Sequence, residues 1–451
     1  MKKLICILLA ALLIASLAAC GGGDSQSGGS TADNPSGKLV VQSWQLGIGP
    51  FQGQTDGQAA YSAFADYFME FYPDIEAEIV HVAYTDHFNR LKVDFASDIG
   101  PDVIGLQTGA PLSEFKSYLA DMEPLALRDM GDGWRDIFVG GALDGLDIEG
   151  IGFVGFPNFL SFAGQMWYAG TMLDSAGVSA PPKDFNELKD AAHKLRDAGY
   201  LPMIIGAKED WINLDCFMVI ASDFDRKNLY DAIEGDASWT TPEMIGAFNM
   251  FQKLFEEGIF QDGALGVNVY MEGYSLWADD DGHGLGGLHI NGSWEMGASS
   301  YNNPNYDTYI SYDRGVARFP DMNGDGKPCP MTAAPDAIYC ITSVSNNVEA
   351  AWAFIRFLVN EEGMQVSADA MSGFPANKNF SPQIEMSPEL KKVFDTISEL
   401  AAGDGVAGYR EIAYPELKQA LADQLQLLAA SATTPEDAAA AVQSASDAQS
   451  R

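Results

Sequence analysis

The sequence is poor in basic residues, in cysteine and in long apolar segments, and each shortage narrows what the protein can do. Its 451 residues include 26 Lys and Arg against 63 Asp and Glu, which gives a formal charge of −37. Such a surface repels phosphate backbones, and no basic stripe or tail is present, so we exclude nucleic-acid binding. The charge also disfavours direct adhesion to anionic lipid. No internal repeat and no second long apolar segment follow the N-terminal stretch.

The cysteines are too few for a disulfide framework. Of the 5 cysteines, Cys6 and Cys20 belong to the N-terminal region, which leaves Cys216, Cys329 and Cys340 for the body of the protein. This odd, sparse set contains no Cys-x-x-Cys metal pair. We expect buried free thiols, with a bridge between Cys329 and Cys340 as the alternative in an oxidising compartment.

The N-terminus has the features of a lipoprotein signal. Lys2 and Lys3 precede 16 uncharged, mostly apolar residues, fewer than the roughly 20 that a transmembrane helix needs. Leu17-Ala18-Ala19-Cys20 resembles a bacterial lipobox. We predict a signal peptide at 1–19 and lipidation of Cys20, with an ordinary secretory signal as the alternative. Residues 20–37 are rich in Gly and Ser and predict a flexible tether.

Strand-like and helix-like segments alternate in the body of the chain. The first segments predict strands at 38–44, 75–82 and 102–106, separated by helices at 61–71 and 86–97. This β-α-β-α-β order predicts a mainly parallel sheet with helices on both faces. In the first helix the residues at helical spacing predict a core face: Tyr61, Phe64, Phe68 and Phe71. Further helices are predicted at 113–119, 185–198, 242–257, 347–359, 388–402, 414–430 and 435–446.

Several short motifs are spread over residues 38–446. They are Tyr72-Pro73-Asp74-Ile75, Gly100-Pro101-Asp102-Val103, Ala176-Gly177-Val178, Pro181-Pro182-Lys183-Asp184-Phe185, Ile290-Asn291-Gly292-Ser293-Trp294, Gly315-Val316-Ala317-Arg318-Phe319-Pro320 and Gly373-Phe374-Pro375-Ala376. In this order, behind a lipobox, they resemble family 1 of the extracellular solute-binding proteins, the carbohydrate-type branch that serves ABC importers. The chain departs from the family pattern at Tyr168-Ala169, where many members have Tyr-Asn.

The resemblance implies an α/β, two-lobed fold of the periplasmic-binding-protein type (type II), in which a hinge joins the lobes and the ligand lies between them. Each lobe would be a mainly parallel sheet flanked by helices. The first lobe is expected at 38–156 plus 310–371, and the second at 157–309 plus 372–451. The expected partners are a carbohydrate and the transmembrane subunits of an ABC permease, and the protein is expected to be a monomer without a cofactor.

No recognised catalytic motif is present. The chain lacks a His-Glu-x-x-His pair, a nucleophile elbow and a Walker loop, so we predict that it is not an enzyme. A secreted glycoside hydrolase remains one alternative, because sequence cannot measure the distance between carboxylates. A ligand-sensing surface lipoprotein is another.

We assign no metal site. Asp321 to Gly326 matches the first half of a calcium loop, but Thr332 stands where the bidentate Glu is required. A surface turn is the favoured interpretation, and calcium binding by the segment from Asp321 to Asp325 is left open.

Aromatic residues, 11% of the chain, carry the information about the ligand. The C–H face of a sugar lies well against Trp or Tyr, and its hydroxyls need convergent polar partners. The predicted contacts follow the first and third strands or lie in segments where the resembled family binds its ligand: Trp44, Gln45, Gln107, Thr108, Trp211, Trp294, Glu295 and Asp336. For any single tryptophan here, core packing is an equal alternative, and Trp352 is assigned to packing. Arg314 and Arg410 could meet an anionic group, but a surface role is favoured for both.

Together these observations predict a substrate-binding lipoprotein on the outer face of a bacterial cytoplasmic membrane. Its predicted ligand is a neutral carbohydrate, an oligosaccharide in preference to a monosaccharide. Cationic solutes are the alternative, because aromatic cages with carboxylates also bind ammonium groups.

Overall fold

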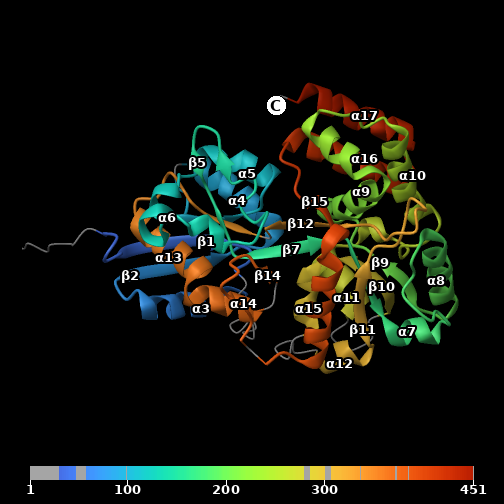
Figure 1. The fold of residues 1–451 in the computed structure, drawn as a ribbon, viewed down its shortest axis with the longest axis horizontal. Helices are drawn as coiled ribbons and strands as arrows, with labels where there is room; N and C mark the ends of the chain where they lie inside the picture. The colour runs from blue at the N-terminus through green and yellow to red at the C-terminus, as the bar shows by residue number, and fades with distance from the viewer. Residues whose placement is uncertain are drawn as a thin grey trace, which may run out of the picture.

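The computed structural model contains two hydrophobic cores, each with its own β-sheet. It describes residues 30–46, 57–97, 99–278, 285–299, 306–335, 337–370, 373–383 and 385–449. One core draws its side chains from residues 39–156 and 337–376, and the other from 166–329 and 390–442. We call the surrounding parts the first and second lobes, which lie side by side (Figure 1). The predicted two-lobed α/β architecture is confirmed.

The sheet of the first lobe is mixed. Its five strands have the order β2 (Ile75–His81), β1 (Gly37–Ser43), β3 (Val103–Leu106), β13 (Ile338–Ile341) and β6 (Phe156–Pro157). β1 pairs in parallel with β2 and β3, as the predicted β-α-β-α-β order requires. β13 is antiparallel to both β3 and β6, because the chain re-enters this lobe from the other one.

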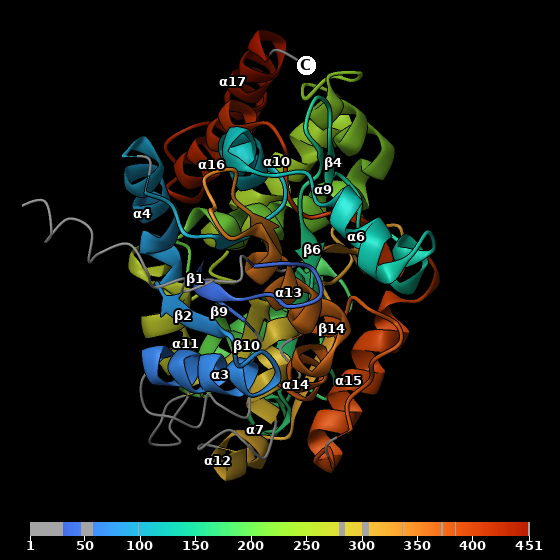
Figure 2. The same cartoon turned by 90° about the vertical axis from the view of Figure 1, so that its left-hand side faces the viewer.

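Helices cover the sheet of the first lobe, and Figure 2 shows this lobe facing the viewer. They are α3 (Gly57–Phe71), α4 (Tyr84–Ala96), α5 (Ala110–Phe115), α6 (Glu123–Met130), α13 (Val348–Asn360) and α14 (Glu362–Ala370), with a small hairpin of β4 (Asp147–Ile148) and β5 (Gly152–Phe153). Phe64 and Phe68 on α3 are buried as predicted. Phe71 is 41% exposed, which corrects its assignment to the core, because it ends the helix at the rim of the lobe.

The sheet of the second lobe is mixed, which corrects the expectation of a mainly parallel sheet: among its described strands β9 pairs in parallel with β10, while β8 is antiparallel to both β10 and β11. Its strand order is β11 (Arg314–Arg318), β8 (Gln165–Ala169), β10 (Gly286–Asn291) and β9 (Leu201–Ile204). The surrounding helices are α7 (Gly170–Ser175), α8 (Phe185–Asp197), α9 (Asp210–Glu234), α10 (Pro242–Glu256), α11 (Tyr274–Ala278), α12 (Tyr306–Ser311), α15 (Pro388–Ala401), α16 (Pro415–Ala429) and α17 (Pro435–Ala448). Among the described residues, no helix combines the length and apolarity needed to cross a membrane.

A third sheet joins the lobes and is visible at the centre of Figure 1. This connecting sheet has the order β14 (Phe374–Pro375), β7 (Phe159–Ala163), β12 (Met331–Pro335) and β15 (Val406–Tyr409). The chain leaves the first lobe through β7 and returns through β12. The predicted boundary at residue 310 is therefore too early, because β11 pairs with β8 and residues 316–329 pack in the second core.

Capping side chains determine where several helices begin. Asp184 accepts a hydrogen bond from the Glu187 N–H at 2.9 Å and starts α8. Ser387 starts α15 in the same way, through the Leu390 N–H at 3.0 Å. Each cap satisfies a backbone donor that has no partner inside its helix. Both helices begin at the predicted residue.

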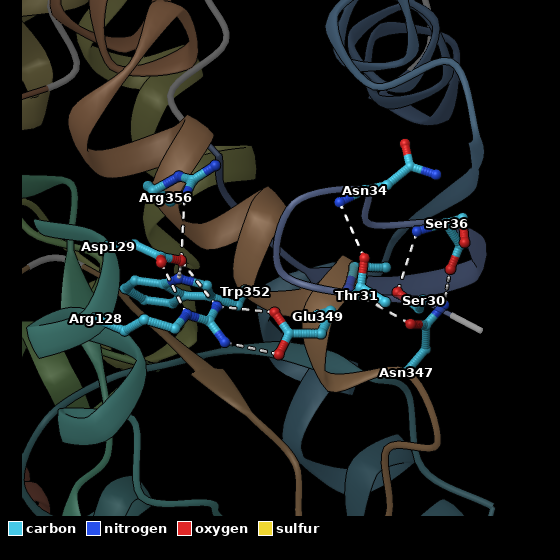
Figure 3. Close-up of polar contacts among 11 residues, drawn as sticks. Ser30, Thr31, Asn34, Ser36, Arg128, Asp129, Asn347, Glu349, Trp352 and Arg356 are labelled. Atoms are coloured by element: carbon cyan, nitrogen blue, oxygen red, sulfur yellow. Dashed lines mark hydrogen bonds and ion pairs between the residues drawn. The ribbon is translucent and has the colours of Figure 1, made fainter. Parts of the chain in front are cut away.

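The N-terminal segment at residues 30–36 is attached to the first lobe, which corrects the expectation of an unstructured tether up to residue 37. Ser36 N donates to Ser30 Oγ at 3.1 Å, and Asn347 Nδ2 donates to the Ser36 backbone oxygen at 2.7 Å (Figure 3). Asn347 also caps α13 by accepting a hydrogen bond from the Ala350 N–H. Composition alone could not reveal this docking, because the partner lies more than three hundred residues away in sequence.

The remaining sequence predictions about packing are confirmed. Cys216, Cys329 and Cys340 are buried free thiols. Trp352 is buried in the first core, and its indole N–H donates to Asp129 Oδ2 at 2.7 Å (Figure 3).

Candidate ligand-binding site

Three aromatic rings form a run on the second lobe. Trp211 stands at the start of α9, and Trp294 follows β10 in a short 3₁₀ segment (Ser293–Ser299). Their ring centroids are 5.8 Å apart with an interplanar angle of 65°. Tyr270 stacks on Trp211 at 5.8 Å and 24°, and 58% of it is exposed. We call Trp294, Trp211 and Tyr270 the aromatic run.

A buried ion pair braces this run. The Arg410 guanidinium lies 4.8 Å from the centroid of Trp294 and 5.7 Å from that of Trp211. Its Nε and Nη2 donate to the two carboxylate oxygens of Asp215 at 2.8 and 2.9 Å. The side chains of Arg410 and Asp215 are 5% and 4% exposed, so the surface role expected for Arg410 is wrong. Burial raises the pKa of Asp215 even though Arg410 lowers it.

The predicted residues of the first lobe gather at the ends of β1 and β3. The half-buried Trp44 ring lies 5.8 Å from Tyr84 and 5.0 Å from His87. Tyr84 donates through its hydroxyl to Gln107 Oε1 at 2.9 Å, and Gln107 and Thr108 are both buried. Burial lowers the pKa of His87 to about 4, so the imidazole is neutral near pH 7.

Gln45 contributes its backbone to the same region. Its carbonyl oxygen accepts hydrogen bonds from the Ser43 hydroxyl and from the Tyr339 hydroxyl. These contacts hold the chain in place directly after Trp44, and they involve no side-chain atom of Gln45.

The two groups of residues meet where the lobes touch. A Cβ placed on Gly109 would lie 2.8 Å from Glu411 Cβ and 2.9 Å from the Ile412 oxygen. Nearby, Ser113 Oγ donates to the Ala413 oxygen at 2.8 Å. Residues 107–109 of the first lobe therefore abut the segment that continues from Arg410. The structure brings the end of β3 and the neighbourhood of the aromatic run to one junction.

Glu295 is a buried centre of hydrogen bonds beside Trp294. Its Oε1 accepts from Trp277 Nε1 at 2.8 Å and from the Tyr309 hydroxyl at 3.0 Å, and its Oε2 accepts from Asn291 Nδ2 at 3.1 Å. Its contact with ligand stays a prediction, since these oxygens already serve the protein.

Arg314 lies beside this centre and not at the surface, which corrects the second expectation about arginine. Its guanidinium lies 4.0 Å from the Trp277 ring centroid, and its Nη2 donates to the Trp277 backbone oxygen at 2.6 Å. Arg314 is buried. It therefore stabilises the position of Trp277, which in turn donates a hydrogen bond to Glu295.

We expect the stability of the protein to fall as the pH rises from 4.5 to 7, in part because of Glu295. Burial raises the pKa of this carboxyl from an ordinary 4.5 to about 7, although hydrogen bonds and Arg314 lower it. Within that window the folded protein keeps a proton that the unfolded chain has lost, so the free energy of unfolding decreases with pH and then levels off. Glu295→Gln should reduce the decrease by about 3 kcal/mol.

Urea denaturation of both proteins between pH 4.5 and 7.5 measures this effect. Burial also raises the pKa of Asp223, to about 6. Its contribution to the pH dependence is the same in both proteins, so it cancels when the two stability profiles are subtracted. Superimposable profiles would contradict the assignment to Glu295.

Several buried polar atoms near the aromatic run have no hydrogen-bond partner among the described residues. They are Trp294 Nε1, Asn213 Oδ1 and Asn291 Oδ1. A buried polar group without a partner is costly, so such atoms need an explanation. They lie on α9, at the end of β10 and on Trp294 itself, so the elements that carry the two tryptophans also enclose these atoms.

The tryptophans divide into two groups. Of the 8 in the chain, Trp134, Trp167, Trp239, Trp277 and Trp352 are fully buried. The other three are Trp44, Trp211 and Trp294, which are half-buried. These three are the tryptophans that the sequence predicts as ligand contacts.

The acidic turn at residues 321–326 is closed by its own carboxylates. Asp321 accepts hydrogen bonds from the Gly324 and Gly326 N–H groups at 2.6 and 2.7 Å. Asp223 and Asp325 bring carboxylate oxygens within 4.8 Å of those of Asp321. The contacts fit the predicted turn.

Two predicted residues lie outside the described part of the chain, namely Asp336 and Cys20. Sequence reasoning missed Asp215 and Tyr270. The Trp-x-x-x-Asp spacing of Trp211 and Asp215 on a helix is a signal that could have indicated the first. Nothing local marks Tyr270, which lies in a π-helical turn (Val269–Gly273).

Several solved structures similar to this chain are named for a sugar or contain a bound one. A chitin oligosaccharide binding protein is 20% identical with a TM-score of 0.74, over 92% of this chain and 98% of the other. Maltose-bound MalE3 of T. maritima is 20% identical with a TM-score of 0.70, over 91% and 99%. A sugar transporter protein of Bacillus licheniformis in complex with stachyose is 19% identical with a TM-score of 0.66, over 92% and 100%.

These similarities establish the periplasmic-binding-protein fold. No curated protein matches the chain. The family model of the bacterial extracellular solute-binding proteins, whose members bind solutes without catalysis, matches residues 52–365. Since this match covers most of the sequence, the chain belongs to the bacterial extracellular solute-binding protein family.

Proposed function

We propose that this protein is the substrate-binding component of an ABC importer and captures an oligosaccharide between its lobes. The observation that carries the proposal is the aromatic run of Trp294, Trp211 and Tyr270. Successive rings offer successive faces to the C–H surfaces of a sugar chain. A monosaccharide would need only one of them.

The charge and the polar groups around the run support a neutral ligand. The chain carries a formal charge of −37, and the nearby Arg410 is already neutralised by Asp215. Arg410 is therefore not available to compensate the charge of an acidic sugar.

Capture would involve rotation of the lobes about the connecting sheet. Ligand bound to both lobes stabilises the arrangement in which they meet, and the equilibrium shifts by the difference in affinity between the open and closed forms. The junction of Gly109 with residues 411–412 lies at the point where the lobes already touch. The closed form would then dock on the permease.

Substitution of the tryptophans tests the ligand assignment. In a thermal-shift screen against oligosaccharides, amino acids and polyamines, we expect a sugar to stabilise the protein by about 2.7 kcal/mol at 100 times its Kd. Trp294→Ala and Trp211→Ala should each weaken that sugar by about 1–3 kcal/mol, the scale of lost stacking on flat rings.

Phe71→Ala is the control, because it removes a partly exposed aromatic ring of the first lobe that packs on Tyr67 and Phe357 and not on the aromatic run. Stabilisation only by polyamines or amino acids would refute the carbohydrate assignment. Turnover of the sugar would refute the binding role and support a hydrolase.

The proposed location is the outer face of the cytoplasmic membrane, with Cys20 as the lipid-bearing residue. A family of extracellular proteins suits this location. The sequence signal is the lipobox before Cys20. Labelling cells with a palmitate analogue should mark the wild-type protein and leave Cys20→Ala unlabelled. Equal labelling of both would rule out lipidation at this residue.

A further inference from the structure

A pocket lies between the last part of α9 and the strand β15, and none of the three rings of the aromatic run lines it. Its volume is about 450 Å³, within the range of roughly 300–1,000 Å³ typical of small-molecule sites. β15 is an edge strand of the connecting sheet, so one side of the pocket is open. The side chains and backbone that matter here are those of Arg226, Lys227, Tyr230, Asp231, Gly408 and Tyr409. We call this the tyrosine pocket.

Tyr409 presents a fixed ring to the tyrosine pocket. Its hydroxyl donates to Glu234 Oε1 at 2.9 Å, while the Tyr414 hydroxyl donates to Glu234 Oε2 at 2.6 Å. Even with its hydroxyl held, 38% of Tyr409 is exposed. A ring that is ordered before binding loses little conformational entropy when a ligand arrives.

Because Gly408 has no side chain, the ring of Tyr230 can pack directly against the backbone of β15. A Cβ on Gly408 would lie only 2.7 Å from Tyr230 Cζ. The Tyr230 hydroxyl donates to the Tyr409 backbone oxygen at 3.0 Å, and the two rings meet edge to face at 4.7 Å. Two aromatic rings are thereby locked together along β15.

Of the two basic side chains beside these rings, Lys227 has an ionic partner among the described residues and Arg226 has none. Lys227 forms an ion pair with Asp231 one turn along α9. Arg226 is exposed, and among the described residues no hydrogen bond or ion pair to its guanidinium is found. The lining therefore offers unused N–H donors beside ordered aromatic faces, in a chain whose formal charge is −37.

We propose that the tyrosine pocket is a second carbohydrate site, which holds one pyranose unit of a glycan outside the space between the lobes. The C–H face of the sugar packs on Tyr409, and Arg226 donates to its ring or hydroxyl oxygens. A second weak attachment raises the effective concentration of the glycan near the main site without requiring tight binding. This goes beyond the proposed function, which needs only the aromatic run.

The test uses the full protein with the main site disabled by Trp211→Ala and Trp294→Ala. The probes are maltotetraose, xylotetraose and chitotetraose, and binding is followed by saturation-transfer NMR and calorimetry. We expect at least one probe to bind this background. Adding Tyr409→Ala or Arg226→Ala should weaken that binding at least about fivefold, whereas Tyr409→Phe, which keeps the ring, should largely preserve it.

Arg90→Ala removes an exposed arginine on α4 of the first lobe and is the matched control for Arg226→Ala. Unchanged residual binding in Tyr409→Ala would overturn the proposal. So would a background that binds no probe while the wild type does, an outcome that leaves the proposed function intact. If the background variant fails to fold, calorimetry of the wild type decides, because Tyr409→Ala should lower the stoichiometry from two probes per chain to one.

Discussion

Asp215→Ala is expected to lower the free energy of unfolding by about 3–5 kcal/mol, because it removes the carboxylate that binds a buried guanidinium through two hydrogen bonds. Both Arg410–Asp215 hydrogen bonds are shorter than 3 Å, and both side chains are almost fully buried. The remaining carboxylate near Arg410 belongs to Glu411, at 3.7 Å from Nη1, and it is also bound by Lys418. Urea denaturation at pH 7 measures the loss.

Two further variants show whether the ion pair is the cause. The double variant Asp215→Leu with Arg410→Met removes both charges together and should be less destabilised than Asp215→Ala. Asp395→Ala breaks the exposed pair with Lys391 and should change stability by about 1 kcal/mol or less. Equal destabilisation of the single and double variants would show that lost packing, and not the unpaired charge, is responsible.

Gly109→Ala is expected to weaken ligand binding at least about tenfold, a change of about 1.4 kcal/mol, because it pushes the lobes apart. The new Cβ would be 2.8 Å from Glu411 Cβ and 2.9 Å from the Ile412 oxygen, both across the junction. Small-angle X-ray scattering should report a larger radius of gyration with ligand present. Calorimetry measures the affinity.

The substitution also lowers the free energy of unfolding through backbone strain, because Gly109 has a φ of +74°, which residues with a Cβ rarely adopt. Such strain costs about 1–3 kcal/mol whatever the surroundings. Gly177→Ala is the matched control, since Gly177 has a φ of +73° and no atom within 4 Å of the added Cβ. Gly177→Ala should lose stability and keep its affinity. Wild-type scattering and affinity in Gly109→Ala would mean that the contact does not control closure.

Local sequence patterns predicted much of the fold because local physics forms those elements. The start of α8 follows from Asp184 and that of α15 from Ser387, each of which caps the helix after it. The first parallel strands follow from apolar segments that alternate with helical ones. In these places each residue's preference agrees with the packing around it.

The longest helix, α9, could not be predicted in this way. Nearly every residue in its first half is buried, from Ile212 to Ser222, so polar and apolar positions do not alternate with helical period. Its direction also changes at Asp225, where the backbone is extended. Such a segment takes its form from the core that encloses it.

The site was predictable in its aromatic residues and not in the groups that hold them. Trp211 and Trp294 stand out by residue type, but the burial of Arg410 depends on Asp215, which lies 195 positions earlier in the chain. Long-range pairs of this kind have no local signature. The same limit applies to the lobe boundary, where β11 looks like any short strand until its pairing with β8 is known.

The division of the tryptophans gives the protein an optical property. Trp134, Trp167, Trp239, Trp277 and Trp352 emit from apolar interiors shielded from solvent. Trp44, Trp211 and Trp294 are half-buried, so water and soluble quenchers reach part of each ring. A sugar that settles on the latter group would alter their emission and leave that of the five interior indoles unchanged. The molecule thus contains a fluorescent sensor and its own internal reference, so occupancy can be followed in native protein without an attached dye.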